Sequence, residues 1–288
     1  MRAVTRADVR RVLRAGPYRH TRRFLRRHHS TVLARIPGAL LPPGWSSGPP
    51  DFVGVGAQRC GTTWWYRAIE LHPEVQRVPA SPKERNFFDR FASEPFTDRS
   101  VVEYHRLFPR RSGRPVGEWT PAYLHDFWVP PLLHRAAPQA RILVLLRDPV
   151  ERYLSGVTAD EAGRRRSDFA TSAFSRGLYH EQLLRVLDHF PRDRVLVLQY
   201  ERCRDDPAGE LERTYAFLGL DDTRFRPAIL EERVNATRVP KLEPDKALLA
   251  ALRAGYRRDA ERLFRDFPEL DASLWTTLSG GAPPAPQP

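Results

Sequence analysis

The chain has 288 residues, of which 41% are hydrophobic, enough for one large globular domain with a substantial core. Its two cysteines, Cys60 and Cys203, exclude a disulfide framework and are typical of a protein of the reducing cytoplasm. No apolar run is long enough to span a bilayer, and the nine histidines show no metal-ligand spacing. These features predict a cytoplasmic globular protein without a metal centre.

The net charge of +12 is concentrated near the N-terminus. Residues 1–35 hold eleven arginines and one acidic residue, a net of +10, which leaves +2 for the remainder. We therefore divide the chain into a basic arm and linker over 1–50, a domain over 51–278 and a disordered tail over 279–288. The arm either contacts an anionic surface, such as the inner membrane or a nucleic acid, or is a solvated leader. We expect peripheral membrane contact and no specific nucleic-acid partner.

The predicted elements of the domain alternate between strands and helices. In chain order, strands are predicted at 52–56, 116–119, 141–146 and 194–199. Helices are predicted at 62–72, 100–108, 172–190, 207–218 and 244–267, with another beginning after Arg147-Asp148-Pro149 and a helical region opening at 120–123. The runs at 141–146 and 194–199 are almost continuously apolar, as in strands buried on both faces of a parallel sheet. The alternation predicts an α/β fold: a single P-loop-like domain with a central parallel β-sheet flanked by helices and a site at the strand C-terminal ends.

The segment after the first strand has the form of a phosphate-binding loop. Its pattern is Gly56-x-x-x-x-Gly61, and a helix follows from about Thr62, so backbone N–H groups and a helix N-terminus can both face an anion. A P-loop nucleoside triphosphatase has Lys where this chain has Thr62, so the loop predicts phosphate binding without ATP or GTP hydrolysis. The candidate ligands are Gln58, Arg59, Cys60, Gly61, Thr62 and Thr63. Alternatively, the two threonines cap the helix and Cys60 is a small filler.

A second candidate phosphate site follows the strand at 141–146. Arg147 comes directly after that strand, and Ser155 lies two turns into the next helix. A fixed guanidinium group and a hydroxyl group suit phosphate oxygens. The alternative is that Arg147 pairs with Asp148 or Glu151 at the helix start.

Together these segments resemble the sulfotransferases that use 3′-phosphoadenosine 5′-phosphosulfate (PAPS), and most closely the heparan sulfate sulfotransferases of the carbohydrate branch and their bacterial relatives. The resemblance covers residues 51–275 and is carried by GAQRCGTT (56–63), KERNFFD (83–89), EWTPAY (118–123), RILVLLRDPVERYLSG (141–156), GLYHEQLLRVLDHFP (177–191), VLVLQYERCRDDP (195–207) and FLGL (217–220). It implies sulfuryl transfer from PAPS to a hydroxyl or amine of a carbohydrate or small-molecule acceptor, with PAP as the product and no metal.

The resemblance also implies roles for residues in each segment. The first loop corresponds to the family's 5′-phosphosulfate loop, where Arg59 stabilises the leaving group, and 147–155 corresponds to its 3′-phosphate site. Glu84 corresponds to the family's loop carboxylate and is the predicted base, the alternative being a surface Glu paired with Lys83 or Arg85. The candidates on the acceptor side are Lys83, Trp119 and Tyr123, and Arg238 and Lys241 are candidates for the 3′-phosphate.

Three positions depart from the family pattern. Arg59 stands where the family usually has Lys, and Asn86 stands where a His is often found. Trp119 occupies the position before TPAY, where the heparan branch has Lys, which argues against a heparan-like acceptor. Core packing is an equally good interpretation of Trp119 and of Tyr123.

Two other functions fit part of the sequence. A P-loop nucleotide kinase-like phosphotransferase fits the glycine spacing, but it lacks the Lys after Gly61 and requires Mg²⁺. A basic polyanion-binding protein fits the arm, but it leaves the phosphate loop unexplained.

Deleting residues 1–40 is expected to abolish co-sedimentation with anionic vesicles, because each basic residue near the surface contributes about 1 kcal/mol. The deletion is expected to leave PAP affinity unchanged, since the arm lies outside both predicted phosphate sites. High salt is expected to have the same effect on vesicle binding as the deletion. If the full-length protein ignores anionic vesicles at low salt, the arm is a leader or binds another partner.

Overall fold

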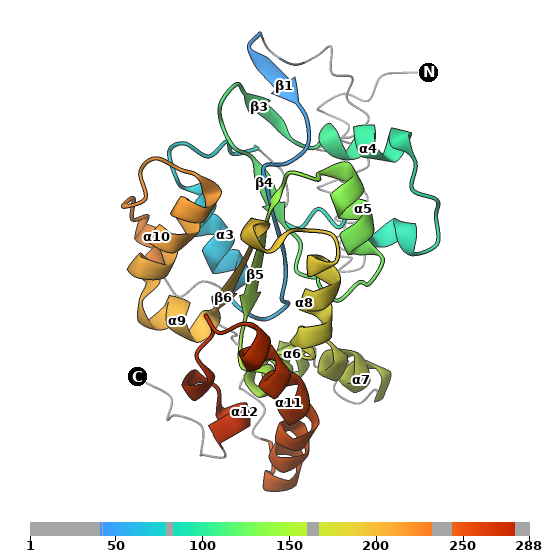
Figure 1. Ribbon diagram of the computed structural model, residues 1–288, viewed down its shortest axis with the longest axis vertical. Coiled ribbons are helices and arrows are strands. Elements are labelled where there is room, and N and C mark those ends of the chain that lie inside the picture. The colour runs from blue at the N-terminus through green and yellow to red at the C-terminus, as the bar shows by residue number, and fades with distance from the viewer. Residues whose placement is uncertain (1–40, 42, 79–82, 160–166, 232–243, 280–288) are drawn as a thin grey trace, which may run out of the picture.

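Figure 1 shows the computed structural model of the protein, which describes residues 41, 43–78, 83–159, 167–231 and 244–279. The basic arm, the tail from residue 280, Arg238 and Lys241 lie outside the described residues, so their assigned roles stay predictions. Among the described helices, none combines the length and the apolar character needed to cross a membrane.

A four-stranded parallel sheet, in the order β4-β2-β5-β6, forms the centre of the molecule. Its strands are β2 (Phe52–Gly56), β4 (Gly117–Trp119), β5 (Arg141–Leu146) and β6 (Val195–Gln199). Every residue of β2 is buried, and so is every residue of β5 after the first, which explains their apolar sequences. A separate antiparallel pair consists of β1 (Trp45–Ser47) and β3 (Pro109–Arg111). The predicted α/β fold with a central parallel sheet is confirmed.

Helices cover both faces of the sheet. Figure 1 shows α3, α9 and α10 on one side and α4, α5 and α8 on the other, with α6, α11 and α12 beyond the end toward which β5 points. The helices are α3 (Thr62–Glu70), α4 (Asp98–His105), α5 (Val129–Ala136), α6 (Pro149–Ala159), α7 (Ser167–Ser175), α8 (Tyr179–Leu187), α9 (Tyr200–Asp205), α10 (Pro207–Leu218), α11 (Lys246–Asp266) and α12 (Thr276–Ser279). Short 3-10 segments span Asp89–Ala92, Arg192–Arg194, Ala228–Glu231 and Ala272–Leu274.

The single helix predicted over 172–190 is wrong, because the structure has two helices there, α7 and α8. The chain turns at Gly177, whose N–H donates to the carbonyl of Phe174 over 2.9 Å. A Cβ atom on Gly177 would lie 2.7 Å from the ring of Tyr256, so the turn packs its backbone directly against α11. The helix then restarts at Tyr179, where the backbone N–H donates to Asp259 of α11 over 2.7 Å.

The buried carboxylate of Asp148 joins the start of α6 to the C-terminal part of the described chain. It accepts hydrogen bonds from the N–H groups of Val150 at 2.9 Å and Glu151 at 3.4 Å, which caps α6. It also accepts bonds from the hydroxyl of Thr276 at 2.9 Å, and from the hydroxyl and N–H of Thr277 at 2.7 and 3.1 Å. One side chain therefore holds α6 and α12 together.

Asp148→Ala is expected to lower the free energy of unfolding by about 3 kcal/mol, because it removes a cap and leaves buried donors without an acceptor. Asp206→Ala is the matched control, since Asp206 also precedes a proline and caps a helix, but it is exposed and accepts a bond from Gly209. The control is expected to lose about 1 kcal/mol. Urea titration followed by circular dichroism measures both, and equal losses would show that the contacts with α12 contribute nothing.

Candidate functional site

The loop between β2 and α3 lies beside the end of β5. The N–H of Ala57 donates to the carbonyl of Leu145 over 2.8 Å. Gly61 has a φ of 84°, and a Cβ atom there would lie 2.8 Å from the ring of Tyr200, so both the backbone and the space require glycine. Helix α3 begins at Thr62 with no acidic residue in its first turn, so its own side chains do not neutralise its positive end. Gln58 and Thr63 are both half-buried at this loop.

The structure brings the two predicted phosphate-binding segments together. Nε of Arg59 donates to Oγ of Ser155 over 3.2 Å, although 96 residues separate them in sequence. The pKa of Arg59 is lowered, chiefly by burial and next by the positive charge of Arg147, with a smaller effect of Arg152. The positive charges of Arg147 and Arg152 each disfavour the charged form of Arg59, and a nearby anion would favour it.

Arg147 contacts two other side chains of this protein. Its guanidinium group donates to the carboxylate of Glu151 over 3.0 Å, so the pairing that the sequence offered as an alternative is present. The same guanidinium lies 5.1 Å from the ring centre of Tyr200. Because that ring also covers Gly61, Tyr200 lies between the first loop and the segment that starts at Arg147.

Sequence reasoning missed Arg152, Tyr179 and Tyr200 as parts of the site. Arg152 is 1% exposed, and its guanidinium group donates to the carbonyl of Ala173. Tyr179 donates its hydroxyl to the carbonyl of Arg147 over 2.9 Å. Each of the three lies inside a segment that carries the family resemblance. A charged residue on a helix usually lies on the surface and an aromatic one in the core. The sequence therefore held no separate signal that would assign these residues to the site.

Cys60 has the character of a structural thiol. It is fully buried, and its Sγ lies 3.7 Å from the hydroxyl oxygen of Tyr179. Burial raises the pKa of Cys60 to about 11, which leaves almost no thiolate at neutral pH. Cys60 therefore links the phosphate loop to α8 as a small buried group and does not have the properties of a nucleophile.

Lys83 and Glu84 lie next to the phosphate loop. Nζ of Lys83 donates to Oγ1 of Thr62 over 3.0 Å and to Oε1 of Glu84 over 3.3 Å. Burial lowers the pKa of Lys83, with Glu84 acting in the opposite direction. The side chain of Glu84 is 48% exposed, so it can meet both solvent and an acceptor. Lys83 thus places an ammonium group at Thr62, the residue that occupies the lysine position of a P-loop triphosphatase.

Trp119 and Tyr123, which the sequence placed on the acceptor side, are both 0% exposed. Nε1 of Trp119 donates to the carbonyl of Gly56 over 3.1 Å, and its ring occupies the space that a Cβ on Gly54 would need. The hydroxyl of Tyr123 accepts a bond from the N–H of Phe87 over 2.9 Å. Both side chains therefore support the site from the core and present no surface to a ligand in this structure. Among the described residues, no group of three or more His, Cys, Asp or Glu side chains has the arrangement of a metal site.

Comparisons with known proteins extend this picture. Mouse heparan sulfate glucosamine 3-O-sulfotransferase 6 is 33% identical over 213 residues, covering 67% of this chain and 59% of the mouse protein. Human heparan sulfate glucosamine 3-O-sulfotransferase 3A1 is 32% identical over 212 residues, covering 66% of this chain and 50% of the human protein. The chain thus matches between half and three fifths of the length of these curated relatives.

A solved structure and a family model agree with these relatives. The structure of a sulfotransferase from Alicyclobacillus acidocaldarius has a TM-score of 0.63 and 25% sequence identity, covering 79% of this chain and 99% of that chain. Residues 49–242 match the family model described as the sulfotransferase domain. The phosphate loop, the Arg147–Ser155 segment and the parallel sheet all fall within that match, and the chain therefore belongs to the sulfotransferase domain family.

Proposed function

We propose that this protein transfers a sulfuryl group from PAPS to a hydroxyl or amine of a carbohydrate or small-molecule acceptor. The observation that carries the proposal is the contact between Arg59 and Ser155, which joins the two predicted anion-binding segments in a member of the sulfotransferase domain family. A nucleotide with phosphate groups at both its 5′ and 3′ positions requires two such segments side by side.

In this proposal each end of the nucleotide has its own set of ligands. Arg59 and the backbone N–H groups of 61–63 hold the 5′-phosphosulfate, and the hydroxyls of Thr62 and Thr63 add hydrogen bonds. Arg147 and Ser155 hold the 3′-phosphate, for which Arg147 turns from Glu151 to the stronger anion. PAPS supplies the sulfuryl group, and the guanidinium charges stabilise the negative charge of the departing phosphate.

Glu84 is the proposed base. It accepts the proton of the acceptor group as that group attacks sulfur, a role that needs a carboxylate with access to both the loop and the acceptor. Its exposed side chain meets this requirement, and the contact of Lys83 with Thr62 holds it beside the phosphate loop. The ammonium group of Lys83 adds a positive charge at the place where the sulfuryl group is transferred.

The acceptor is proposed to be a sugar hydroxyl, because the two mammalian relatives are named for transfer to glucosamine. The buried Trp119 supplies no cation at the position where the heparan branch has Lys. We therefore propose a glycan less anionic than heparan sulfate. We also retain as proposals the cytoplasmic location and the peripheral membrane contact of the arm.

Neither alternative function is favoured. Family membership argues against a nucleotide kinase, as does Thr62 at the lysine position of the P-loop. A polyanion-binding role for the arm does not account for the arrangement of Arg59, Ser155 and Lys83 around the loop.

Calorimetry in EDTA is expected to show that PAP binds more tightly than AMP, because the 3′-phosphate has ligands of its own. Arg147→Ala is expected to weaken PAP binding by about 1.5–3 kcal/mol, the usual contribution of a hydrogen bond to a charged group, and to leave AMP nearly unchanged. Arg204→Ala is the control, since Arg204 is exposed on α9 and pairs with Asp205. Equal affinities for PAP and AMP would contradict the 3′-phosphate assignment.

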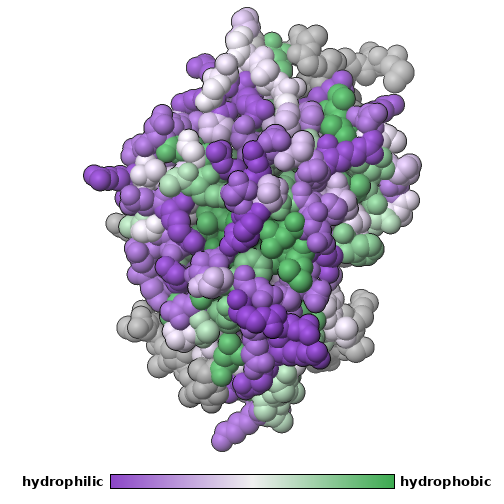
Figure 2. All heavy atoms as spheres, in the orientation of Figure 1, coloured by the Kyte–Doolittle hydropathy of each residue, from purple (hydrophilic) through white to green (hydrophobic). Residues whose placement is uncertain are grey.

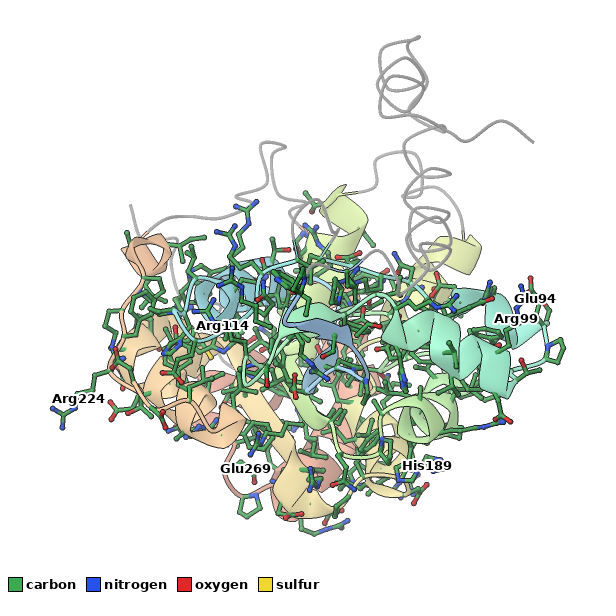
Figure 3. All side chains as sticks on the ribbon, turned by 90° about the horizontal axis from the view of Figure 1, so that it is seen from above. Glu94, Arg99, Arg114, His189, Arg224 and Glu269 are labelled. Carbon is green, nitrogen blue, oxygen red and sulfur yellow. The ribbon has the colours of Figure 1, made fainter. Side chains whose placement is uncertain are left out.

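Glu84→Gln is expected to retain PAP affinity and to lower turnover by at least ~100-fold, because glutamine keeps the shape of the side chain and removes its basicity. Transfer of label from PAPS to a panel of sugars and aryl glycosides measures turnover. Glu94→Gln is the control, since Figure 3 places Glu94 at the periphery of the molecule, where it pairs with Arg90. Turnover of Glu84→Gln at the wild-type rate would place the base elsewhere.

A further inference from the structure

A buried group of side chains holds the loop that carries Glu84. The group consists of Glu118, Thr120 and Tyr123, which we call the loop anchor, and all three residues are 0% exposed. The proposed chemistry assigns no role to Glu118 or Thr120. The anchor faces backbone atoms of the 83–88 loop, so it acts on the course of the chain around Glu84.

The anchor and its neighbour Trp119 bond the backbone on both sides of Glu84. Oγ1 of Thr120 accepts the N–H of Arg85 at 3.0 Å and that of Asn86 at 3.4 Å. The hydroxyl of Tyr123 accepts the N–H of Phe87 at 2.9 Å. Before Glu84, the carbonyl of Lys83 accepts the N–H of Trp119 at 3.3 Å. Three successive amides and one carbonyl of the loop are therefore held by one short segment.

Glu118 orients the hydroxyl group of Thr120. Its Oε2 accepts the hydroxyl of Thr120 at 2.6 Å and the N–H of Arg85 at 3.3 Å, and its Oε1 accepts the hydroxyl of Tyr104 at 2.7 Å. Because the Thr120 proton points to Glu118, the oxygen lone pairs of Thr120 are left for the loop amides. Burial raises the pKa of Glu118, and the nearby positive charge of Arg85 opposes that rise.

Successive side chains of the loop point in opposite directions. Arg85 is 2% exposed, and its guanidinium lies 4.9 Å from the ring centre of Phe108, whereas the side chain of Glu84 is 48% exposed. The anchor is also tied to β2, because the N–H of Thr120 donates to the carbonyl of Gly54 over 2.9 Å. The strand that ends in the phosphate loop and the loop that carries Glu84 therefore share one support.

We propose that the loop anchor positions the carboxylate of Glu84 relative to the phosphate loop, so that Glu118, Thr120 and Tyr123 are positioning residues for sulfuryl transfer. The inference rests on the proposed function, since it takes Glu84 as the base. A general base must lie within hydrogen-bond distance of the attacking group, so a small displacement of its carboxylate lowers the rate of transfer. A loop that is hydrogen-bonded at three amides resists that displacement.

The test is Thr120→Val, which keeps the shape of the side chain and removes the acceptor of two loop amides. The measured rate is transfer of label from PAPS to the same panel of sugars and aryl glycosides that measures the turnover of Glu84→Gln. The expected result is a kcat lower by about 10- to 100-fold, with PAP affinity within about twofold of wild type. Thr120→Ser, which restores the hydroxyl, is expected to recover most of the rate.

A double-mutant cycle with Glu84→Gln separates positioning from a general structural loss. If Thr120 acts through Glu84, then adding Thr120→Val to Glu84→Gln is expected to change the rate by less than about twofold. Effects that multiply in the double variant would overturn the inference while leaving the base assignment intact. Full activity of Glu84→Gln would instead overturn the proposed base, and the inference with it.

Hydrogen exchange supplies a readout that does not depend on turnover. In Thr120→Val, amides of the 83–88 loop are expected to exchange faster, with the 56–63 loop unchanged, and unchanged exchange at 83–88 would contradict the inference. Thr214→Val is the matched control, because Thr214 is also a buried threonine whose hydroxyl is hydrogen-bonded, to Glu210 and Trp65. If Thr120→Val does not fold, Tyr123→Phe removes the acceptor of the Phe87 amide and takes its place in the cycle with the same expected outcomes.

Discussion

The parallel pairing of β2 with β5 is the constraint on which the site depends. Because both strands run the same way, the segments that follow them leave at the same edge of the sheet. The phosphate loop after β2 therefore meets the helix after β5, where Arg59 contacts Ser155. The neighbouring strands add to the same edge: β4 leads into the Thr120 segment, and β6 leads into Tyr200. Figure 1 shows this end of the sheet facing α6, α11 and α12.

Several arginine side chains lie at this edge of the sheet, and the fold must accommodate their positive charges when no ligand is bound. Here the pKa of Arg59 is lowered first by partial burial and then by the positive charges of Arg147 and Arg152. Neutral groups hold this region together, since Tyr179 bonds the backbone of Arg147 and contacts the buried thiol of Cys60. Glu151 pairs with Arg147 at a partly exposed position, where an ion pair contributes little to stability. In the proposed function, the two phosphate groups of the nucleotide offset this positive charge.

Apolar packing, as well as charge, positions the segments of the site. The ring of Trp119 lies against Gly54, and its indole N–H donates to the carbonyl of Gly56. Its backbone N–H donates to the carbonyl of Lys83, so Trp119 joins β2 to the Glu84 loop through the core. Figure 2 shows apolar side chains near the middle of a mostly hydrophilic face. Trp119, the last residue of β4, and Tyr123, which follows it, are fully buried and support the site from the core. Trp119 and Tyr123 bond the backbone on either side of Glu84, at the carbonyl of Lys83 and the N–H of Phe87.

The sequence by itself determined the α/β fold, the glycine-bearing loop between the first strand and its helix, and the family, because apolar strand runs, glycine spacing and motif order are local properties of the chain. It predicted the strand at 141–146 and the helix at 207–218 with the bounds that the structure has. Only the tertiary structure decided the break between α7 and α8, since the contact of Gly177 with Tyr256 joins residues far apart in sequence. The same holds for the burial of Trp119 and Tyr123, the contact of Lys83 with Thr62, and the places of Arg152 and Tyr179. A side chain is buried or exposed according to what the rest of the fold packs against it, and no spacing in a single sequence records that.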